Sequence, residues 1–221
     1  EGNIRSAIGL AEAIAPCVLW LDEIEKGFSG VQSSGMTDGG TTARVFASFL
    51  TWMQEKEKPV FVIATANDLD RLPPELLRKG RFDEIFFVDL PGVREREVIF
   101  SINLARKMRP VENYDLKKLA EESIGFNGAE IEAAVESALF FAFERADRGE
   151  EPSDLTMKDL LDAIHATVPL SATRRAHIEQ MRKVAAGRFV PASDAEPEPL
   201  TQKSVELTES EKTAGRTIQL N

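Results

Sequence analysis

Apolar runs of strand length alternate with helical patterns over residues 1–91. The runs occupy residues 17–21, 59–65 and 84–90, and apolar residues recur at helical spacing over 3–15 and 41–56. Uninterrupted apolar runs are typical of strands that are buried on both faces of a parallel sheet. The alternation predicts an α/β fold, with helices flanking a partial parallel sheet that has strands near 17–21, 60–65 and 84–89. Residues 71–80 are expected to form a turn and a short helix that Gly80 ends.

From Gly92 onward the apolar periodicity is helical only. Helices are predicted near 93–108, 114–122, 128–148, 154–166 and 171–186. Because Pro91-Gly92 breaks the third strand, we place a boundary there, between an α/β domain at 1–91 and a small all-α lid domain with a C-terminal helix at 92–186. Residues 187–221 are poor in large apolar residues and rich in Pro, Glu, Ser and Thr, which predicts a disordered tail.

Composition narrows the classes of protein to which the chain can belong. Its apolar content of 43% can supply a sizeable core, whereas its net charge of −10 argues against general nucleic-acid binding, which needs a basic face. The single cysteine, Cys17, cannot form an internal disulfide, and this fits a cytoplasmic location. No apolar run approaches the roughly 20 residues of a membrane span, so no membrane partner is predicted.

Polar side chains lie at the ends of the predicted strands, where open parallel sheets bind their ligands. Asp22 and Glu23 follow the first strand, Asn67 follows the second, and Arg78 and Arg81 precede the third. Such a set suits phosphoryl transfer. Asp22 would hold Mg²⁺ through water, and Glu23 would polarise the attacking water. Asn67 would orient that water or sense the terminal phosphate, while the arginines would neutralise the charge that develops as the phosphate bond breaks.

Each of these features alone has a plain structural explanation. Asp-Glu after an apolar run is commonly a solvated turn, a lone Asn67 is commonly a turn former, and the arginines could pair with Glu75 or Asp83. The joint order and spacing of the features favour the catalytic interpretation. A two-metal nuclease is the weaker alternative, since it needs more acidic ligands near Asp22 and a basic substrate face.

The same segments resemble the AAA ATPases of the AAA+ superfamily. "APCVLWLDEIEKGF" (15–28) is similar to their Walker B segment, and "FVIATANDLDRLPPELLRKGRFDEIFFVDLPG" (61–92) is similar to their second region of homology. "FNGAEIEAAVESALFFAF" (126–143) resembles the start of the lid helix near the adenine, with Asn127 and Glu130 in place of the usual Ser and Asp. The resemblance spans about residues 1–166. Within the family, it is strongest to a bacterial subfamily that some algal plastids also encode.

The resemblance implies an activity and a set of roles. The protein would hydrolyse ATP with Mg²⁺, as part of a homo-oligomeric ring, a hexamer, that remodels a protein substrate. The roles it implies are Mg²⁺ binding for Asp22, catalytic base for Glu23, sensor 1 for Asn67, arginine fingers for Arg78 and Arg81, and nucleotide contact for Gly128 and Ala129.

The sequence contains no phosphate-binding loop of the form G-x-x-x-x-G-K-[ST]. The nearest match, "GVQSSGMT" (30–37), has Met36 where lysine is needed and follows the Asp-Glu strand, so it resembles the second pore loop of the family instead. "EGNIR" at the start resembles the stretch after the first pore loop. We therefore expect a parent ATPase of which these 221 residues are the C-terminal part of the module, inactive alone. The alternative is a truncated or degenerate module that acts as a non-catalytic interaction or regulatory domain.

Overall fold

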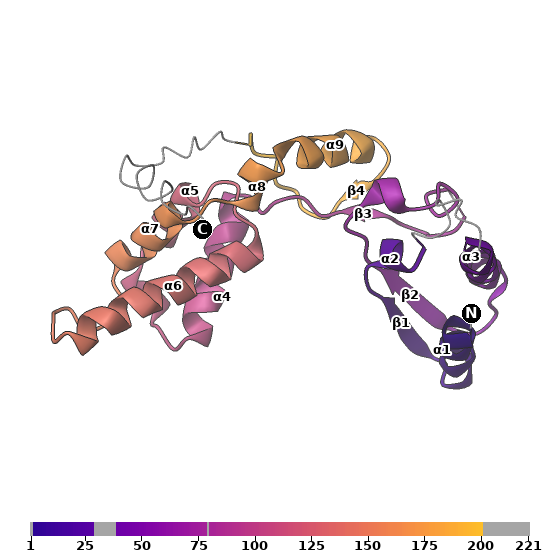
Figure 1. The fold of residues 1–221 in the computed structure, drawn as a ribbon, viewed down its shortest axis with the longest axis horizontal. Helices are drawn as coiled ribbons and strands as arrows, with labels where there is room; N and C mark the ends of the chain where they lie inside the picture. Colours follow the sequence, from indigo (N-terminus) through magenta and orange to yellow (C-terminus); the bar gives the residue numbers. More distant parts are fainter. Residues whose placement is uncertain (1, 29–38, 79, 201–221) are drawn as a thin grey trace, which may run out of the picture. The chain divides into compact units, whose positions relative to one another are not determined.

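The computed structural model describes residues 2–28, 39–78 and 80–200. The chain divides into two compact units, Glu1–Ile85 and Phe86–Asn221, so the division falls before the Pro91-Gly92 boundary expected from the sequence (Figure 1). Most of the predicted second pore loop and residues 201–221 of the predicted tail lie outside the described residues. None of the described helices is long and apolar enough to cross a membrane.

The first unit is built on a parallel strand pair, as the sequence predicts. Its elements are α1 (Gly2–Ala13), β1 (Cys17–Leu21), α2 (Ile24–Phe28), α3 (Gly39–Glu55), β2 (Val60–Ala64) and the 3₁₀ turn η2 (Leu69–Arg71). β1 and β2 run side by side, with Cys17 opposite Val60 and Leu21 opposite Ala64 (Figure 1). Both strands therefore end at the same edge of the sheet, and the residues that follow them meet there.

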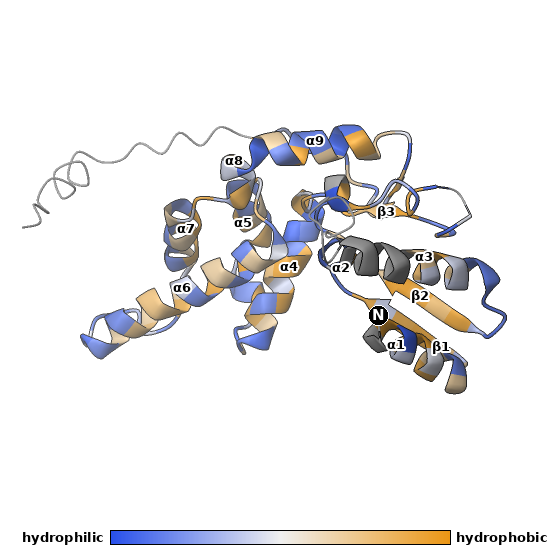
Figure 2. Cartoon of the chain, turned by 45° about the vertical axis from the view of Figure 1, so that its right-hand side comes forward, coloured by the Kyte–Doolittle hydropathy of each residue, from blue (hydrophilic) through white to orange (hydrophobic). Residues whose placement is uncertain are grey.

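One face of this strand pair packs on the core of the unit. The core is formed by buried side chains from α2, α3 and the segment after η2, namely Ile24, Phe49, Leu50, Met53, Leu72 and Leu76. Leu21 and Val62 pack against it, whereas Val18, Trp20 and Phe61 on the other face are 60%, 61% and 66% exposed. Both strands are strongly apolar (Figure 2), but within the described part of the first unit no element buries that second face. Within this unit the strands are therefore buried on one face, whereas the apolar runs predicted burial on both.

The segment after η2 forms consecutive turns instead of the expected short helix. The N–H groups of residues 76–78 donate to the carbonyls of residues 73–75, three residues back, at 3.0–3.4 Å. Residues 73 and 74 are both proline, and Pro74 disfavours the α-helical backbone conformation at the residue before it, which hinders a regular α-helix from starting there. Gly80 adopts φ +90° at the end of the segment, a conformation that glycine tolerates best.

The second unit is mainly helical, which confirms the predicted lid. Its helices are α4 (Val93–Arg106), the 3₁₀ turn η3 (Val111–Asn113), α5 (Leu116–Glu122), α6 (Gly128–Asp147), α7 (Met157–Ala166), α8 (Leu170–Thr173) and α9 (Arg175–Ala185). The predicted helix at 171–186 is split into α8 and α9, which meet at Arg174. Fully buried side chains from α4 to α7 form a single core, including Phe100, Leu104, Ile131, Val135, Leu160 and Ile164.

The third predicted strand is shorter than expected. Only β3 (Phe86–Phe87) forms there, and it pairs in parallel with β4 (Val190–Pro191) in the second unit. The ladder stops early because Asp89 turns its carboxylate to the backbone N–H of Leu90 and to Arg182, and because Pro91 has no N–H.

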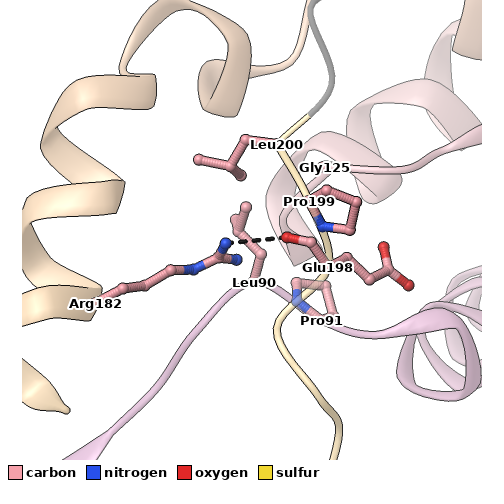
Figure 3. Close-up of a pocket in the computed structure, with 7 residues that line it drawn as sticks. All are labelled: Leu90, Pro91, Gly125, Arg182, Glu198, Pro199 and Leu200. Atoms are coloured by element: carbon pink, nitrogen blue, oxygen red, sulfur yellow. Dashed lines mark hydrogen bonds between the residues drawn. The ribbon is translucent and has the colours of Figure 1, made fainter.

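Residues 187–200, which we call the strap, contradict part of the predicted disordered tail. The carboxylate of Glu198 binds the guanidinium of Arg96, which is completely buried and also donates to the carbonyls of Pro91 and Ala120. Arg182 donates a 2.9 Å hydrogen bond to the carbonyl of Glu198 (Figure 3). The strap is held by charge pairing rather than by a run of apolar residues. Its composition therefore resembled that of a disordered segment.

The strap also packs closely against Gly92, just before α4. A side chain at Gly92 would place its Cβ 2.9 Å from the Cβ of Ala195, so the approach requires glycine. The residues that line the small pocket in this region are Leu90, Pro91, Gly125, Arg182, Glu198, Pro199 and Leu200 (Figure 3).

Candidate functional site

Thr65 joins the ends of the two parallel strands. Its N–H donates to the Leu21 carbonyl at 2.9 Å, and its own carbonyl accepts from Ile24 N–H at 3.0 Å. Its hydroxyl donates to Asp22 Oδ1 at 2.5 Å and accepts from Glu23 N–H at 3.0 Å. The first residue after β2 thus fixes both acids that follow β1. Our sequence analysis missed Thr65 because it counted this residue as the end of the second strand, whereas the strand pairing ends at Ala64.

Asn67 lies against Glu23 at one edge of the sheet. Asn67 Nδ2 donates to Glu23 Oε1 at 3.0 Å. The other carboxylate oxygen, Oε2, pairs with Lys26 Nζ at 2.5 Å, and the Glu23 side chain remains 36% exposed. The hydrogen bond and the charge of Glu23 raise the pKa of Lys26. Glu23 is therefore a solvent-accessible carboxylate held in place by an amide on one side and an ammonium on the other.

The backbone of Glu23 adopts a conformation that is rare for a residue with a side chain. Its φ is +51°, in the left-handed region. Such backbone is costly, on the order of 1–3 kcal/mol, and it recurs at functional sites because the surrounding contacts must impose it. Here the Thr65 hydroxyl bonded to Glu23 N–H and the Thr65 carbonyl bonded to Ile24 N–H supply those contacts.

Glu25 is a third acid of the same turn, and our sequence analysis assigned it no role. It is 3% exposed, and its Oε1 accepts a 3.2 Å hydrogen bond from the backbone N–H of Asn67. Its Oε2 has no hydrogen-bond partner among the described residues. Asn67 is consequently held by two acids, Glu25 at its backbone and Glu23 at its side chain.

Asp22 offers one carboxylate oxygen for a cation. Oδ1 accepts from Thr65, and the residue is exposed at the strand end. Nowhere in the described part of the chain do three or more His, Cys, Asp or Glu side chains gather into a metal site. A single exposed carboxylate fits Mg²⁺, which keeps most of its waters and is held in nucleotide sites by one or two carboxylates together with the phosphates.

The two arginines differ in their surroundings. Arg81 is partly buried, and its Nη1 donates to the carbonyl of Leu50 in α3 at 3.1 Å. Arg78 is exposed, and within the described residues no ion pair joins it to Glu75 or Asp83. In the described part of the chain, neither arginine thus forms the ion pair with Glu75 or Asp83 that was considered as the plain structural explanation.

The two predicted lid residues, Gly128 and Ala129, begin α6. The Asn127 side chain accepts from Glu130 N–H at 2.9 Å, and Glu130 Oε2 accepts from Asn127 N–H at 2.8 Å, which makes a reciprocal capping box. Glu130 Oε1 also accepts from the N–H of Leu170. A side chain added at Gly128 would meet no atom within 4 Å, so space is open beside the start of α6. Asn and Glu therefore keep the cap that Ser and Asp would form.

Two protein-family models match parts of this chain. Residues 1–90 match the family model "ATPase family associated with various cellular activities (AAA)", and residues 113–162 match the AAA+ lid domain. The AAA domain-containing protein ycf46 of Guillardia theta is 48% identical over 183 residues, covering 82% of this chain and 34% of the relative. The protein of the same name in Pyropia yezoensis is 45% identical over 183 residues, covering 82% of this chain and 36% of the relative. The chain thus spans about a third of the length of these curated relatives.

Proposed function

Because this chain belongs to the AAA family of ATPases, we propose that the full-length protein hydrolyses ATP with Mg²⁺ and that Asp22, Glu23 and Asn67 form the acidic part of its catalytic centre. The observation that carries this proposal is the 3.0 Å hydrogen bond from the Asn67 amide to the Glu23 carboxylate, beside Asp22 at one edge of the sheet. An accessible carboxylate with a fixed orientation is what general-base activation of water requires.

Glu23 retains the capacity to bind the attacking water. A carboxylate has about four acceptor positions, and Asn67 and Lys26 occupy one on each oxygen. A water bound at a remaining position would pass its proton to Glu23 as it attacks. Mg²⁺, when bound with the nucleotide, supplies charge neutralisation on the phosphates, and Asp22 would hold it through a coordinated water.

The remaining roles rest on the family and on local exposure. We assign Arg78 and Arg81 to the nucleotide of a neighbouring subunit in a homo-hexameric ring, and Gly128 and Ala129 to the nucleotide of the same subunit. The exposed side chain of Arg78 supports its assignment, whereas Arg81 would first have to release the Leu50 carbonyl. The proposed work of the ring is to remodel a protein substrate in the cytoplasm. The net charge of −10 supports a protein rather than a nucleic-acid substrate.

We further propose that residues 1–221 alone bind ATP weakly and do not turn it over. Their sequence contains no G-x-x-x-x-G-K-[ST] segment, and the amides and lysine of that segment supply much of the grip on the phosphates. Calorimetric titration of these residues with MgATP should therefore give no micromolar affinity.

Phosphate release by the full-length protein tests the proposed activity. The wild type should release phosphate in the presence of Mg²⁺, and Glu23→Gln should bind ATP but turn it over about 10²–10⁴-fold more slowly, because glutamine keeps the shape and cannot accept the proton. A wild type that binds ATP without releasing phosphate would instead favour the non-catalytic interaction domain. Turnover near wild type in Glu23→Gln would remove Glu23 from the role of base.

A further inference from the structure

We propose that Glu25 is the positioning residue that fixes Asn67 against Glu23; the catalytic consequence of this inference rests on the proposed ATPase function. Glu25 Oε1 accepts the backbone N–H of Asn67 at 3.2 Å, while Asn67 Nδ2 reaches Glu23 Oε1 at 3.0 Å. Two acids of one turn thereby hold Asn67: Glu25 binds its backbone, and Glu23 binds its side chain. Glu25 acts through Asn67 and does not touch the reacting atoms.

The burial of Glu25 is not explained by stability. The residue is 3% exposed, and one of its carboxylate oxygens has no hydrogen-bond partner in the part of the chain that the structure describes. Burying an incompletely bonded polar group costs free energy, and replacing buried charge by an apolar side chain of similar volume is often neutral or stabilising. A methionine at this position would fill the same space next to Ile24, which belongs to the core. The carboxylate therefore needs a functional reason to be there.

The placement of Asn67 supplies that reason. Asn67 lies beyond the end of β2 (Val60–Ala64), after Thr65 has made its backbone bonds to Leu21 and Ile24. The sheet ladder ends at that point, so Asn67 depends on side chains to hold its backbone. Without the acceptor of Glu25, the amide of Asn67 would be free to move relative to Glu23, and displacements of about 1 Å at a positioning group can cost about 10²-fold in rate.

Glu25 is not an alternative catalytic base. Its side chain is almost completely buried, whereas the Glu23 side chain is 36% exposed and can meet a water. Glu25 also has no role in shaping the Asp22 carboxylate, which is held by the Thr65 hydroxyl. Among the described residues, the hydrogen bond that Glu25 accepts comes from the N–H of Asn67.

Two variants of matched length separate positioning from packing. Glu25→Gln keeps an acceptor for the Asn67 N–H, and Glu25→Met keeps the length of the side chain and removes the acceptor. In the full-length protein we expect Glu25→Met to lower kcat by about 10–100-fold with KM within about twofold, as for other residues that orient a catalytic group. Its Tm should be unchanged or higher. Glu25→Gln should keep most of the wild-type kcat. Met53→Ala, in the same core, is the control that lowers Tm without touching Asn67.

Hydrogen–deuterium exchange at the Asn67 amide of the full-length protein gives a readout that does not depend on turnover. Exchange should be slow in the wild type and Glu25→Gln and faster in Glu25→Met, because only the last lacks an acceptor. A wild type without ATPase activity would refute the proposed function, and the exchange rates would still decide whether Glu25 holds Asn67. Equal exchange in all three proteins, or a kcat that follows Tm across Glu25→Met and Met53→Ala, would overturn the inference.

Discussion

Asn67 and Glu23 come from turns that follow two different strands, and a 3.0 Å hydrogen bond from Asn67 Nδ2 to Glu23 Oε1 joins them. Removing the amide should leave Glu23 paired with Lys26 alone, so that its carboxylate turns away from the position in which it would meet water. We expect Asn67→Ala to lower the kcat for phosphate release by the full-length protein by about 10²-fold. Asn113→Ala, an exposed position in the second unit, should have no effect. Equal kcat values in the two variants would contradict the role of Asn67.

Arg145 and Asp159 give the helical unit a pH-dependent stability. Burial by itself would raise the pKa of Asp159, but hydrogen bonds from Arg145 and Thr156 outweigh it and hold this pKa at about 2, below the ordinary value of 3.8. The folded state therefore binds this proton less readily than the unfolded state. The resulting stabilisation, about 2 kcal/mol, is complete above about pH 4 and is lost as the pH falls toward 2.

The variant Asp159→Asn tests this linkage. It cannot ionise, so its free energy of unfolding should lie below that of the wild type at pH 7. The difference should shrink as the pH is lowered from about 4 to 2. Urea unfolding followed by helical circular dichroism, in the wild type and the variant at both pH values, measures the difference. A gap that stays constant with pH would show that the ion pair does not contribute in this way.

Glu198 neutralises the buried guanidinium of Arg96 and so attaches the strap to the second unit. Breaking a fully buried pair by removing one partner costs about 3–5 kcal/mol. Since the Glu198 side chain is 28% exposed, solvent compensates part of that loss, and we expect about 1–3 kcal/mol for Glu198→Gln. Thermal unfolding compared with Glu196→Gln, an exposed acid of the same strap, isolates the pairing. Equal Tm values would mean that the strap is not held by this contact.

The sequence predicted the helices of the second unit well, because their patterns and caps are local. Asn127 and Thr156, for example, each cap a helix through a residue only three positions away. The strap was not predicted, because the contact of Arg96 with Glu198 spans 102 positions and leaves no periodic pattern. The pairing of the third strand was not predicted for a similar reason. Phe86 and Phe87 are apolar enough for any sheet, and only the structure reveals β4 as their partner.

The sequence predicted those residues of the candidate site that directly follow the strands. Asp22, Glu23 and Asn67 follow strands that end at one edge, so their proximity follows from a parallel register. Whether Glu25 faces the core or solvent depends on the conformation of the turn, which includes the positive φ of Glu23, and no periodicity encodes that. The contact of Arg81 with the Leu50 carbonyl likewise depends on tertiary packing.

Arg78 and Arg81 should act on a nucleotide bound by a neighbouring subunit, and mixed rings can test this. In other phosphoryl-transfer systems an arginine delivered in trans is worth about 10³–10⁵ in rate. Arg81→Ala would also remove the bond to the Leu50 carbonyl, so the exposed Arg78 is the cleaner position to change. We expect full-length Arg78→Ala to have normal Tm and greatly reduced phosphate release.

Mixed with inactive Glu23→Gln subunits, the Arg78→Ala protein should regain activity, because some interfaces then combine an intact Glu23 with an intact Arg78. If Arg78 acted within its own chain, every site in the mixture would be defective. No recovery, in rings shown by mass spectrometry to contain both variants, would therefore count against its action across an interface.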